Sequence, residues 1–248
     1  MTDSSDIFAD LNLEPQPTDS IDFDHILVIG RNFSEYNDMF LLDDRKPSDG
    51  AIMNVGGGVS SFTVEAAQRG FNILSGDPVY SLDSDVIEGK CDNDIECYLI
   101  NHINKPHLYN WGHPFRDVDQ EREARRNSYK MFLEDFRKNR WRYLDALFPY
   151  TPFIAKNNFS LSLVSHLLFV YEKFIDYETH VKIIKEILRI TSDEVRIYPL
   201  INLQLKTSEL VGRIMKDPRF DEVSFELRPT RYNFIKAADK MMVIKKSR

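Results

Sequence analysis

The spacing of apolar residues along the chain alternates between short strand-like runs and stretches with helical periodicity. A β-branched run over 26–29 is stopped by Gly30, and apolar positions at helical spacing predict a helix over 33–42. Further along, the pattern predicts a buried strand over 159–164, a helix over 178–190, a strand over 194–200, and a hairpin with strands over 223–227 and 241–245 and a turn near Pro229. This alternation is typical of an α/β domain.

The most informative pattern lies between residues 51 and 77. A strand over 51–55 runs into the triplet Gly56-Gly57-Gly58, and a helix over 62–69, capped by Ser60 or Ser61, follows the triplet. A second strand over 71–74 leads to Asp77. Strand, glycine turn, helix, strand and acid in this order predict a nucleotide-binding βαβ unit.

A glycine turn at the start of a helix directs backbone N–H groups and the positive helix end toward one point, where a ligand can approach because no Cβ intervenes. Asp77 lies 21 residues after Gly56, a spacing that suits hydrogen bonds to ribose hydroxyls. The dinucleotide pattern G-x-G-x-x-G is incomplete because Ser61 occupies its third glycine position, and the Gly-Lys-Ser/Thr of a P-loop is absent. A nucleotide-like ligand is therefore expected, and a tight structural turn is the alternative.

The residues around this turn resemble class I S-adenosylmethionine-dependent methyltransferases. The run Asn54-Val55-Gly56-Gly57-Gly58-Val59-Ser60-Ser61-Phe62, with Ser75-Gly76-Asp77-Pro78-Val79-Tyr80, is similar to a bacterial branch with a G-x-S-S-F glycine turn. The similarity also includes residues 30–40, 150–171 and 194–200. Two positions depart from the usual pattern: Asn54 stands where an acid usually begins the first motif, and Ser160 stands where Asp is common.

This resemblance implies a Rossmann-like, seven-stranded α/β methyltransferase fold and S-adenosyl-L-methionine as the cofactor. It places the three glycines near the methionine part of the cofactor, Asp77 at the ribose and Pro78 beside the adenine, with Asn54 at the position of the acid that orders the glycine loop. Ser165 and His166 follow the fourth strand, where methyl donor and acceptor meet. The candidate cofactor-binding residues are Asn54, Gly56, Gly57, Gly58, Asp77, Pro78, Ser165, Arg31 and Tyr36. His166 is the candidate catalytic residue, as a general base, and a histidine that only supports the cofactor loop is the alternative.

Charge is distributed unevenly along the 248 residues. Residues 1–24 hold seven acids and no Lys or Arg, and the remainder is balanced at 32 acids and 32 bases. We expect an acidic, disordered arm over 1–20 and a single domain over 21–248, in which 80–145 is a mainly helical insertion that covers the acceptor side. The basic block over 122–142 leaves nucleic acid open as a partner, although a solvated helix face is favoured.

Other features set limits on the class of protein. No apolar run is long enough to span a membrane, and two cysteines imply no disulfide framework, so a cytoplasmic protein is expected. Cys91, Cys97, His102, His107 and His113 lack the spacing of a zinc site, so no metal is expected. The sequence thus predicts a methyltransferase whose acceptor and oligomeric state are not specified. The alternatives are a methyltransferase-like cofactor-binding or regulatory protein without turnover and, less favoured, a nicotinamide-dependent oxidoreductase.

Overall fold

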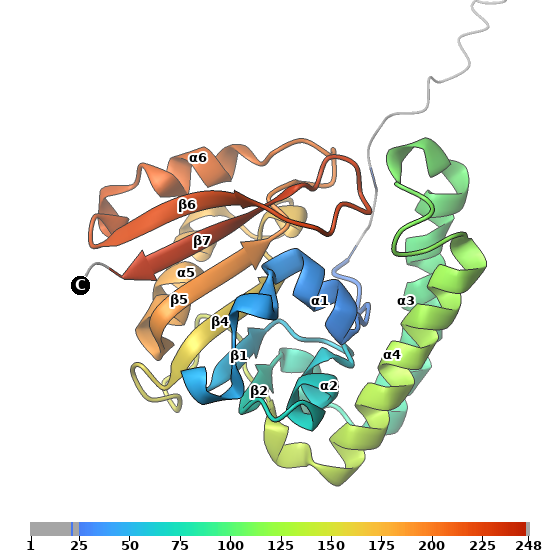
Figure 1. Ribbon diagram of the computed structural model, residues 1–248, viewed down its shortest axis with the longest axis horizontal. Coiled ribbons are helices and arrows are strands. Elements are labelled where there is room, and N and C mark those ends of the chain that lie inside the picture. Colours follow the sequence, from blue (N-terminus) through green and yellow to red (C-terminus); the bar gives the residue numbers. More distant parts are fainter. Residues whose placement is uncertain (1–20, 22–24, 247–248) are drawn as a thin grey trace, which may run out of the picture.

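A computed structural model describes residue 21 and residues 25–246 of the chain (Figure 1). The expected acidic arm over 1–20 lies outside the described residues. Within them, no helix combines the length and the apolar character needed to cross a lipid bilayer.

Helices and strands alternate along most of the chain. The α-helices are α1 (Phe33–Phe40), α2 (Phe62–Gln68), α3 (Ser84–Asn104), α4 (Val118–Lys138), α5 (Tyr177–Ile190) and α6 (Glu209–Met215). The strands are β1 (Ile52–Val55), β2 (Ile73–Gly76), β3 (Tyr143–Leu144), β4 (Phe159–Ser165), β5 (Thr191–Tyr198), β6 (Val223–Pro229) and β7 (Lys240–Lys246). Short 3₁₀ turns cover Leu42–Asp44, Pro47–Asp49, Pro78–Ser81, Pro106–Leu108, Arg140–Arg142, Phe169–Tyr171 and Pro218–Phe220.

All seven strands form one sheet in the order β3-β2-β1-β4-β5-β7-β6. The first five strands of that order pair in parallel, and β7 runs antiparallel to both β5 and β6. This sheet confirms the expected seven-stranded, Rossmann-like α/β fold. The strand order reverses direction between β1 and β4, which is the place where open α/β sheets bind their ligands.

Helices cover both faces of the sheet, as a parallel sheet requires (Figure 1). One core joins α1 and α2 to one face, and includes Tyr36, Phe40 and Phe62. A second core joins α5 and α6 to the other face. The long helices α3 and α4 pack against each other and stand beside this sandwich, at the right of Figure 1.

Several predicted boundaries differ from the structure. The second strand spans Ile73–Gly76 rather than 71–74, because it pairs with β1 from Ile73, opposite Ile52, to Gly76, opposite Val55. The hairpin has no tight turn near Pro229. Residues 230–239 connect its strands instead, because Tyr232 and Phe234 within them are buried in the core. The short strand β3 and helix α6 have no counterpart among the predicted elements.

The register brings the carboxyl ends of four strands to one edge of the sheet. Val55 of β1 pairs with Gly76 of β2 and with Val164 of β4, and Ser165 pairs with Tyr198 of β5. The segments that follow these residues therefore start side by side, and they form the candidate site.

Candidate functional site

The glycine turn follows β1 directly, and its backbone requires glycine at two positions. Gly56 has φ 64° and Gly58 has φ 49°, both in the left-handed region that side chains with a Cβ rarely adopt. Gly57 requires glycine for another reason, because an added Cβ would lie 2.0 Å from Ser75 Oγ. The sequence predicts that the missing Cβ atoms of the glycine turn make room for a ligand. At Gly57 the missing Cβ instead makes room for Ser75 of the neighbouring strand β2.

Asp77 holds the glycine turn in place. Its carboxylate accepts hydrogen bonds from the backbone N–H of Gly58 and of Val79, each at 2.9 Å, and one bond goes to each oxygen. Tyr80 donates to the carbonyl of Gly58 at 2.7 Å and fixes the same residue from the other side. Burial raises the pKa of Asp77, and the two N–H donors oppose that shift. Each carboxylate oxygen keeps a lone pair with which to accept a further donor from the cavity.

Asn54 lies behind the turn rather than in the cavity. Its side chain is fully buried, accepts a hydrogen bond from the Tyr36 hydroxyl at 3.2 Å, and donates to Ser75 Oγ at 3.3 Å. Tyr36 in turn stacks on Phe62 with a centroid distance of 3.9 Å and lines the cavity. Asn54 therefore connects β1, β2 and α1, and reaches a ligand only through Tyr36 and the turn.

Arg31 is a buried cation that faces the cavity. Its backbone N–H donates to Ser60 Oγ at 3.1 Å, which fixes it beside the glycine turn, and the residue is only 7% exposed. Nε of Arg31 is buried, and no residue that the structure describes forms a hydrogen bond with it. Glu35, on the following helix, pairs with Arg125 at 2.7 Å instead. An unpartnered buried guanidinium is unfavourable unless a ligand supplies the counter-charge.

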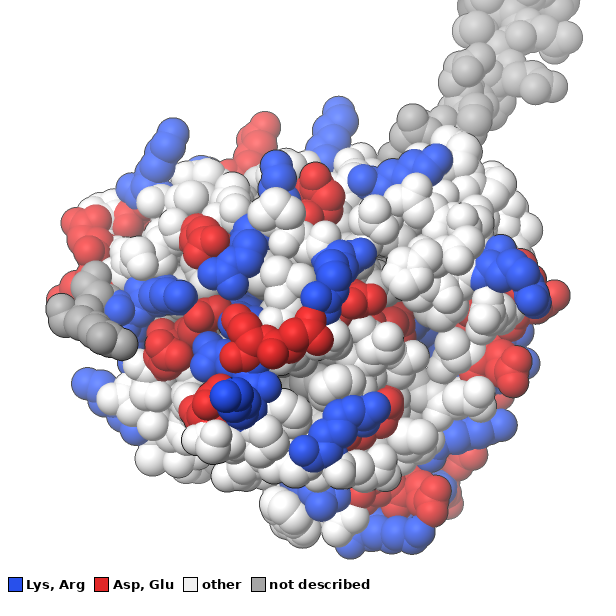
Figure 2. Space-filling model, viewed as in Figure 1, with Lys and Arg blue, Asp and Glu red and all other residues white. Residues whose placement is uncertain are grey.

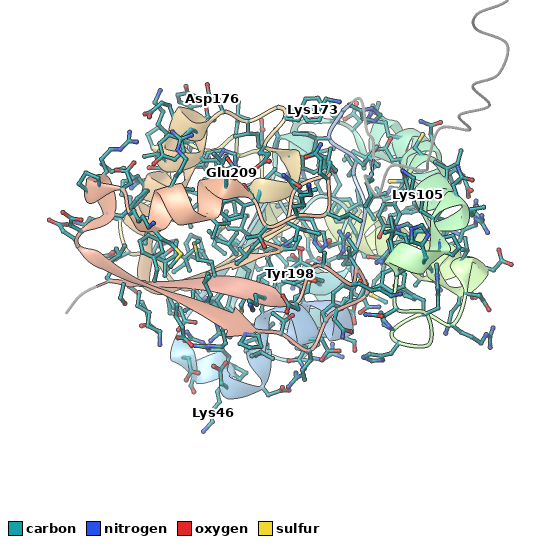
Figure 3. The ribbon with its side chains drawn as sticks, turned by 90° about the horizontal axis from the view of Figure 1, so that it is seen from above. Lys46, Lys105, Lys173, Asp176, Tyr198 and Glu209 are labelled. Carbon is teal, nitrogen blue, oxygen red and sulfur yellow. The ribbon has the colours of Figure 1, made fainter. Side chains whose placement is uncertain are left out.

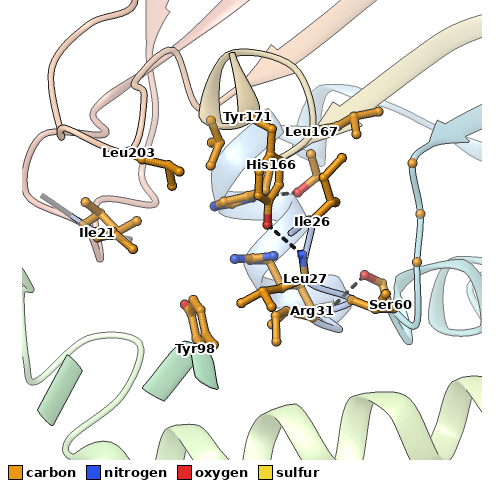
Figure 4. A pocket seen from close by; sticks show the side chains of 18 of the residues that line it. Ile21, Ile26, Leu27, Arg31, Ser60, Tyr98, His166, Leu167, Tyr171 and Leu203 are labelled. Carbon is orange, nitrogen blue, oxygen red and sulfur yellow. Dashed lines mark hydrogen bonds between the residues drawn. The ribbon is translucent and has the colours of Figure 1, made fainter. Parts of the chain in front are cut away.

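Ser165, the last residue of β4, and His166, which follows it, line the same cavity. Figure 4 shows His166 there. His166 has φ 51°, a strained conformation for a residue with a side chain, and its N–H donates to the carbonyl of Tyr198 at 2.7 Å. Ser165 Oγ lies 3.0 Å from His166 Nδ1 and donates to Met39 Sδ at 3.7 Å. The direction of the bond between Ser165 and His166 depends on the imidazole tautomer. When the serine proton goes to Met39, Nδ1–H donates to Ser165 and Nε2 keeps its lone pair.

The His166 imidazole is neutral near pH 7. Burial moves the pKa of His166 well below its usual range, and the positive charges of Arg31 and Arg125 lower it further. Tyr198 packs edge-on against the ring at 5.4 Å. Figure 3 shows Tyr198 in the interior of the molecule, where its hydroxyl donates to the carbonyl of Ala238 at 2.8 Å. The ring of His166 is therefore held by packing as well as by Ser165.

The N-terminal segment of residues 25–29 closes one side of the cavity. The backbone N–H of Leu27 donates to the Tyr171 hydroxyl at 3.2 Å, and that of Val28 donates to Asp94 Oδ2 at 2.9 Å. Val28 lies over Gly58, because a Cβ added to that glycine would lie 3.6 Å from Val28 Cγ1. This β-branched run is irregular backbone in the structure and forms no strand.

Opposite the glycine turn, most residues of the cavity wall are apolar, and Asn202 is a polar residue among them. The empty space within the cavity and its open mouth together is about 940 Å³. Figure 4 shows Arg31 and His166 at its centre, Tyr98 of α3 below them, and Ile21 and Leu203 on the far side. The apolar residues of that wall are Ile21, Val170, Ile201, Leu203, Leu205 and Ile235.

Most of the predicted site residues meet in this cavity. The residues that line it are Arg31, Tyr36, Gly56, Gly57, Gly58, Asp77, Ser165 and His166. Asn54 and Pro78 are not among its lining residues. Sequence reasoning missed several parts of the cavity lining, namely Tyr98, Tyr171 and the segments around Leu27 and Leu203. Each comes from an irregular segment or from a helix with no distinctive motif.

Acidic partners neutralise much of the basic block on α4. Carboxylates of α3 pair with Arg122, Arg126 and Arg137, and acids of α4 pair with Lys138 and Arg142. On the face shown in Figure 2, Lys and Arg are interspersed with Asp and Glu. Within the described part of the chain, no three His, Cys, Asp or Glu side chains are grouped closely enough to hold a metal ion.

Comparison with known proteins gives one strong sequence match. The chain is 36% identical over 222 residues to the uncharacterized protein MJ0045 of Methanocaldococcus jannaschii, covering 89% of this chain and 96% of that protein. A putative S-adenosyl-L-methionine-dependent methyltransferase of Methanococcus maripaludis aligns with a TM-score of 0.39 and 13% identity, covering 80% of this chain and 78% of the other. A SAM-dependent methyltransferase of Methanosarcina mazei aligns with a TM-score of 0.41 and 10% identity, covering 84% of this chain and 97% of the other. No protein-family model matches the chain.

Proposed function

The chain belongs to the family of the M. jannaschii protein MJ0045, and from the geometry of its cavity we propose that it binds S-adenosyl-L-methionine and transfers the methyl group to an acceptor. The observation that carries this proposal is the meeting of three features in one cavity. These are the glycine turn, the Asp77 carboxylate and the Arg31 guanidinium, whose Nε has no hydrogen-bond partner among the described residues.

The polar groups of this cofactor match those three features. Its ribose hydroxyls are donors, and each Asp77 oxygen has a lone pair left after the bonds from Gly58 and Val79. Its methionine carboxylate supplies the anion that the Arg31 guanidinium lacks. When bound, the cofactor supplies an electrophilic methyl group on a positively charged sulfur.

The remaining predicted residues have supporting roles in this proposal. Tyr36 contacts the methionine part, and Asn54 keeps the Tyr36 hydroxyl and Ser75 in position behind the turn. Pro78, exposed directly after Asp77, borders the adenine. Ser165 fixes the His166 tautomer, and His166 accepts the proton that the acceptor releases.

Titration calorimetry tests cofactor binding directly. We expect saturable heats with S-adenosylmethionine and S-adenosylhomocysteine and none with NADH. We expect Asp77→Asn, which removes the charge, to weaken S-adenosylhomocysteine binding about ten- to a hundredfold, since a hydrogen bond to a charged group contributes about 1.5–3 kcal/mol. The matched control is Asp119→Asn, because the side chain of Asp119 is 91% exposed.

Two outcomes would change the conclusion. The absence of heat with both sulfur compounds at high micromolar concentration would refute the proposal. Binding without methyl transfer to any acceptor would leave a cofactor-binding or regulatory protein as the function.

A further inference from the structure

Three polar groups face the cavity without a partner in the described chain. They are the Arg31 guanidinium through Nε, the Tyr98 hydroxyl and Nε2 of His166. Arg31 Nε is itself fully buried, whereas the Tyr98 hydroxyl and His166 Nε2 keep accessible surface in the described part of the chain. A buried polar atom is normally satisfied, so Arg31 Nε, with two accessible polar groups near an apolar wall, indicates a ligand that bonds to them.

From this arrangement we infer that the methyl acceptor is a small apolar molecule with a phenolic hydroxyl or a thiol, bound between Tyr98, His166 and the wall of Leu203 and Ile235. This inference rests on the proposed function, since it assigns the second ligand of the same cavity. In the proposed function the Arg31 guanidinium binds the cofactor's carboxylate, so Tyr98 and His166 are the groups that remain to bind the acceptor.

The charges that line the cavity disfavour other acceptor classes. Asp77 is the one carboxylate among the described lining residues, and it lies at the glycine turn with the ribose. Among the described residues, a protonated amine would therefore meet Arg31 without a second carboxylate to pair with it, at a cost in desolvation. A nucleic acid or phosphorylated acceptor requires several cations, and Arg31 is the one Lys or Arg that lines the cavity in the described residues.

A weak acid fits the two remaining groups. The acceptor's O–H or S–H donates to Nε2 of His166, and burial, which raises the pKa of Tyr98, keeps the Tyr98 hydroxyl protonated as a donor to the same atom. In the transfer, a lone pair of that oxygen or sulfur forms a bond to the methyl carbon. The bond from methyl carbon to sulfonium breaks, its electron pair stays on sulfur, and the acceptor's proton goes to Nε2. The products are a methyl ether or thioether, S-adenosylhomocysteine and an imidazolium.

Tyr98 is held in place by a buried group behind it. Its ring contacts His102 at 4.3 Å, and His102 Nδ1 lies 2.6 Å from Glu121 Oε2. Tyr98 is therefore fixed for hydrogen bonding, which favours one orientation of the acceptor.

Three ring compounds test the acceptor class: thiophenol and phenol are weak acids, and benzylamine carries an amine that is protonated at neutral pH. Calorimetry on protein saturated with S-adenosylhomocysteine measures binding of each. Mass spectrometry with S-adenosylmethionine then identifies the methylated product. We expect thiophenol or phenol to bind and to be methylated, and benzylamine to do neither.

Two variants test the assigned residues. We expect His166→Gln to lower kcat about a hundredfold, in the usual range for loss of a general base, while S-adenosylhomocysteine binding is kept. We expect Tyr98→Phe to weaken acceptor binding about fivefold, as expected for one hydrogen bond. The controls are His113→Gln and Tyr150→Phe, whose side chains are largely exposed.

The outcomes separate this inference from the proposed function. If S-adenosylhomocysteine binds but none of the three compounds does, or benzylamine is bound or methylated as well as phenol and thiophenol, the acceptor class is refuted and the proposed function stands. If kcat is unchanged in His166→Gln, the assigned proton acceptor is refuted. If S-adenosylhomocysteine does not bind, both fail together.

Discussion

The Arg31 side chain is the residue on which the cofactor assignment depends most directly. It is a buried cation whose Nε has no partner in the described part of the chain, and in the proposed function it binds the methionine carboxylate. We expect Arg31→Met, which keeps an apolar stem, to weaken S-adenosylhomocysteine binding about tenfold or more. Binding of 5′-methylthioadenosine is expected to change little, because that nucleoside has no carboxylate. Titration calorimetry with both compounds measures the difference.

Arg116→Met is the matched control, since the Arg116 side chain is 80% exposed. An equal loss of affinity for both compounds would show that Arg31 supports the shape of the cavity and does not contact the carboxylate.

Individual residues also show what a motif predicts and what it leaves open. Asp77 was predictable because its spacing from the glycine turn depends on one βαβ unit. Asn54 occupies a motif position too, yet its side chain points away from the cavity to Tyr36 and Ser75. Because successive strand residues face opposite sides, the contacts of Asn54 depend on where α1 packs, which the motif does not contain.

At the level of elements, the segment of residues 25–29 covers the place where the cofactor would lie. The hydroxyl of Tyr171 and the carboxylate of Asp94 hold its backbone. We expect Tyr171→Phe, which leaves the Leu27 N–H without that acceptor, to speed amide hydrogen exchange in residues 25–29 and to raise the association rate of S-adenosylhomocysteine severalfold. Exchange mass spectrometry and stopped-flow binding measure the two effects.

Tyr177→Phe serves as the control for this segment, because the Tyr177 hydroxyl bonds to Asp217 on another part of the surface. If exchange in residues 25–29 is the same in Tyr171→Phe and the parent protein, then the Tyr171 hydroxyl does not restrain the segment.

For the molecule as a whole, the sheet was more predictable than the cavity wall. The strands carry their pattern locally, and β1, β4 and β5 lie where apolar runs predict them. The wall opposite the glycine turn combines Tyr98 of α3, Leu203 after β5 and Ile235 after β6. These residues are far apart in sequence, and no local pattern distinguishes them from ordinary core residues. Only the packing of the complete chain brings them together.

One buried ionic cluster joins four segments that are far apart in sequence: α1, α3, α4 and the β6–β7 connection. Arg125 of α4 is fully buried and pairs with Glu35 of α1 at 2.7 Å and with Glu121 at 3.0 Å. Glu121 also contacts His102 of α3, and Tyr232 of the β6–β7 connection donates to Glu35 at 2.9 Å. The cluster therefore fixes α3, and with it the Tyr98 wall, against the helix that follows Arg31.

Replacing Arg125 leaves the carboxylates of Glu35 and Glu121 buried without their cation. We expect Arg125→Met to lower the free energy of unfolding by about 3–5 kcal/mol, as for other buried ion pairs that lose one partner. Arg126→Met, at a partly exposed position that pairs with Asp92, is expected to cost less than about 1 kcal/mol. Adding Glu35→Gln to Arg125→Met is expected to restore part of the lost free energy of unfolding, because it removes one of the two unpaired buried charges. Urea unfolding of the four proteins measures these differences, and equal losses at Arg125 and Arg126 would show that the cluster does not hold the segments together.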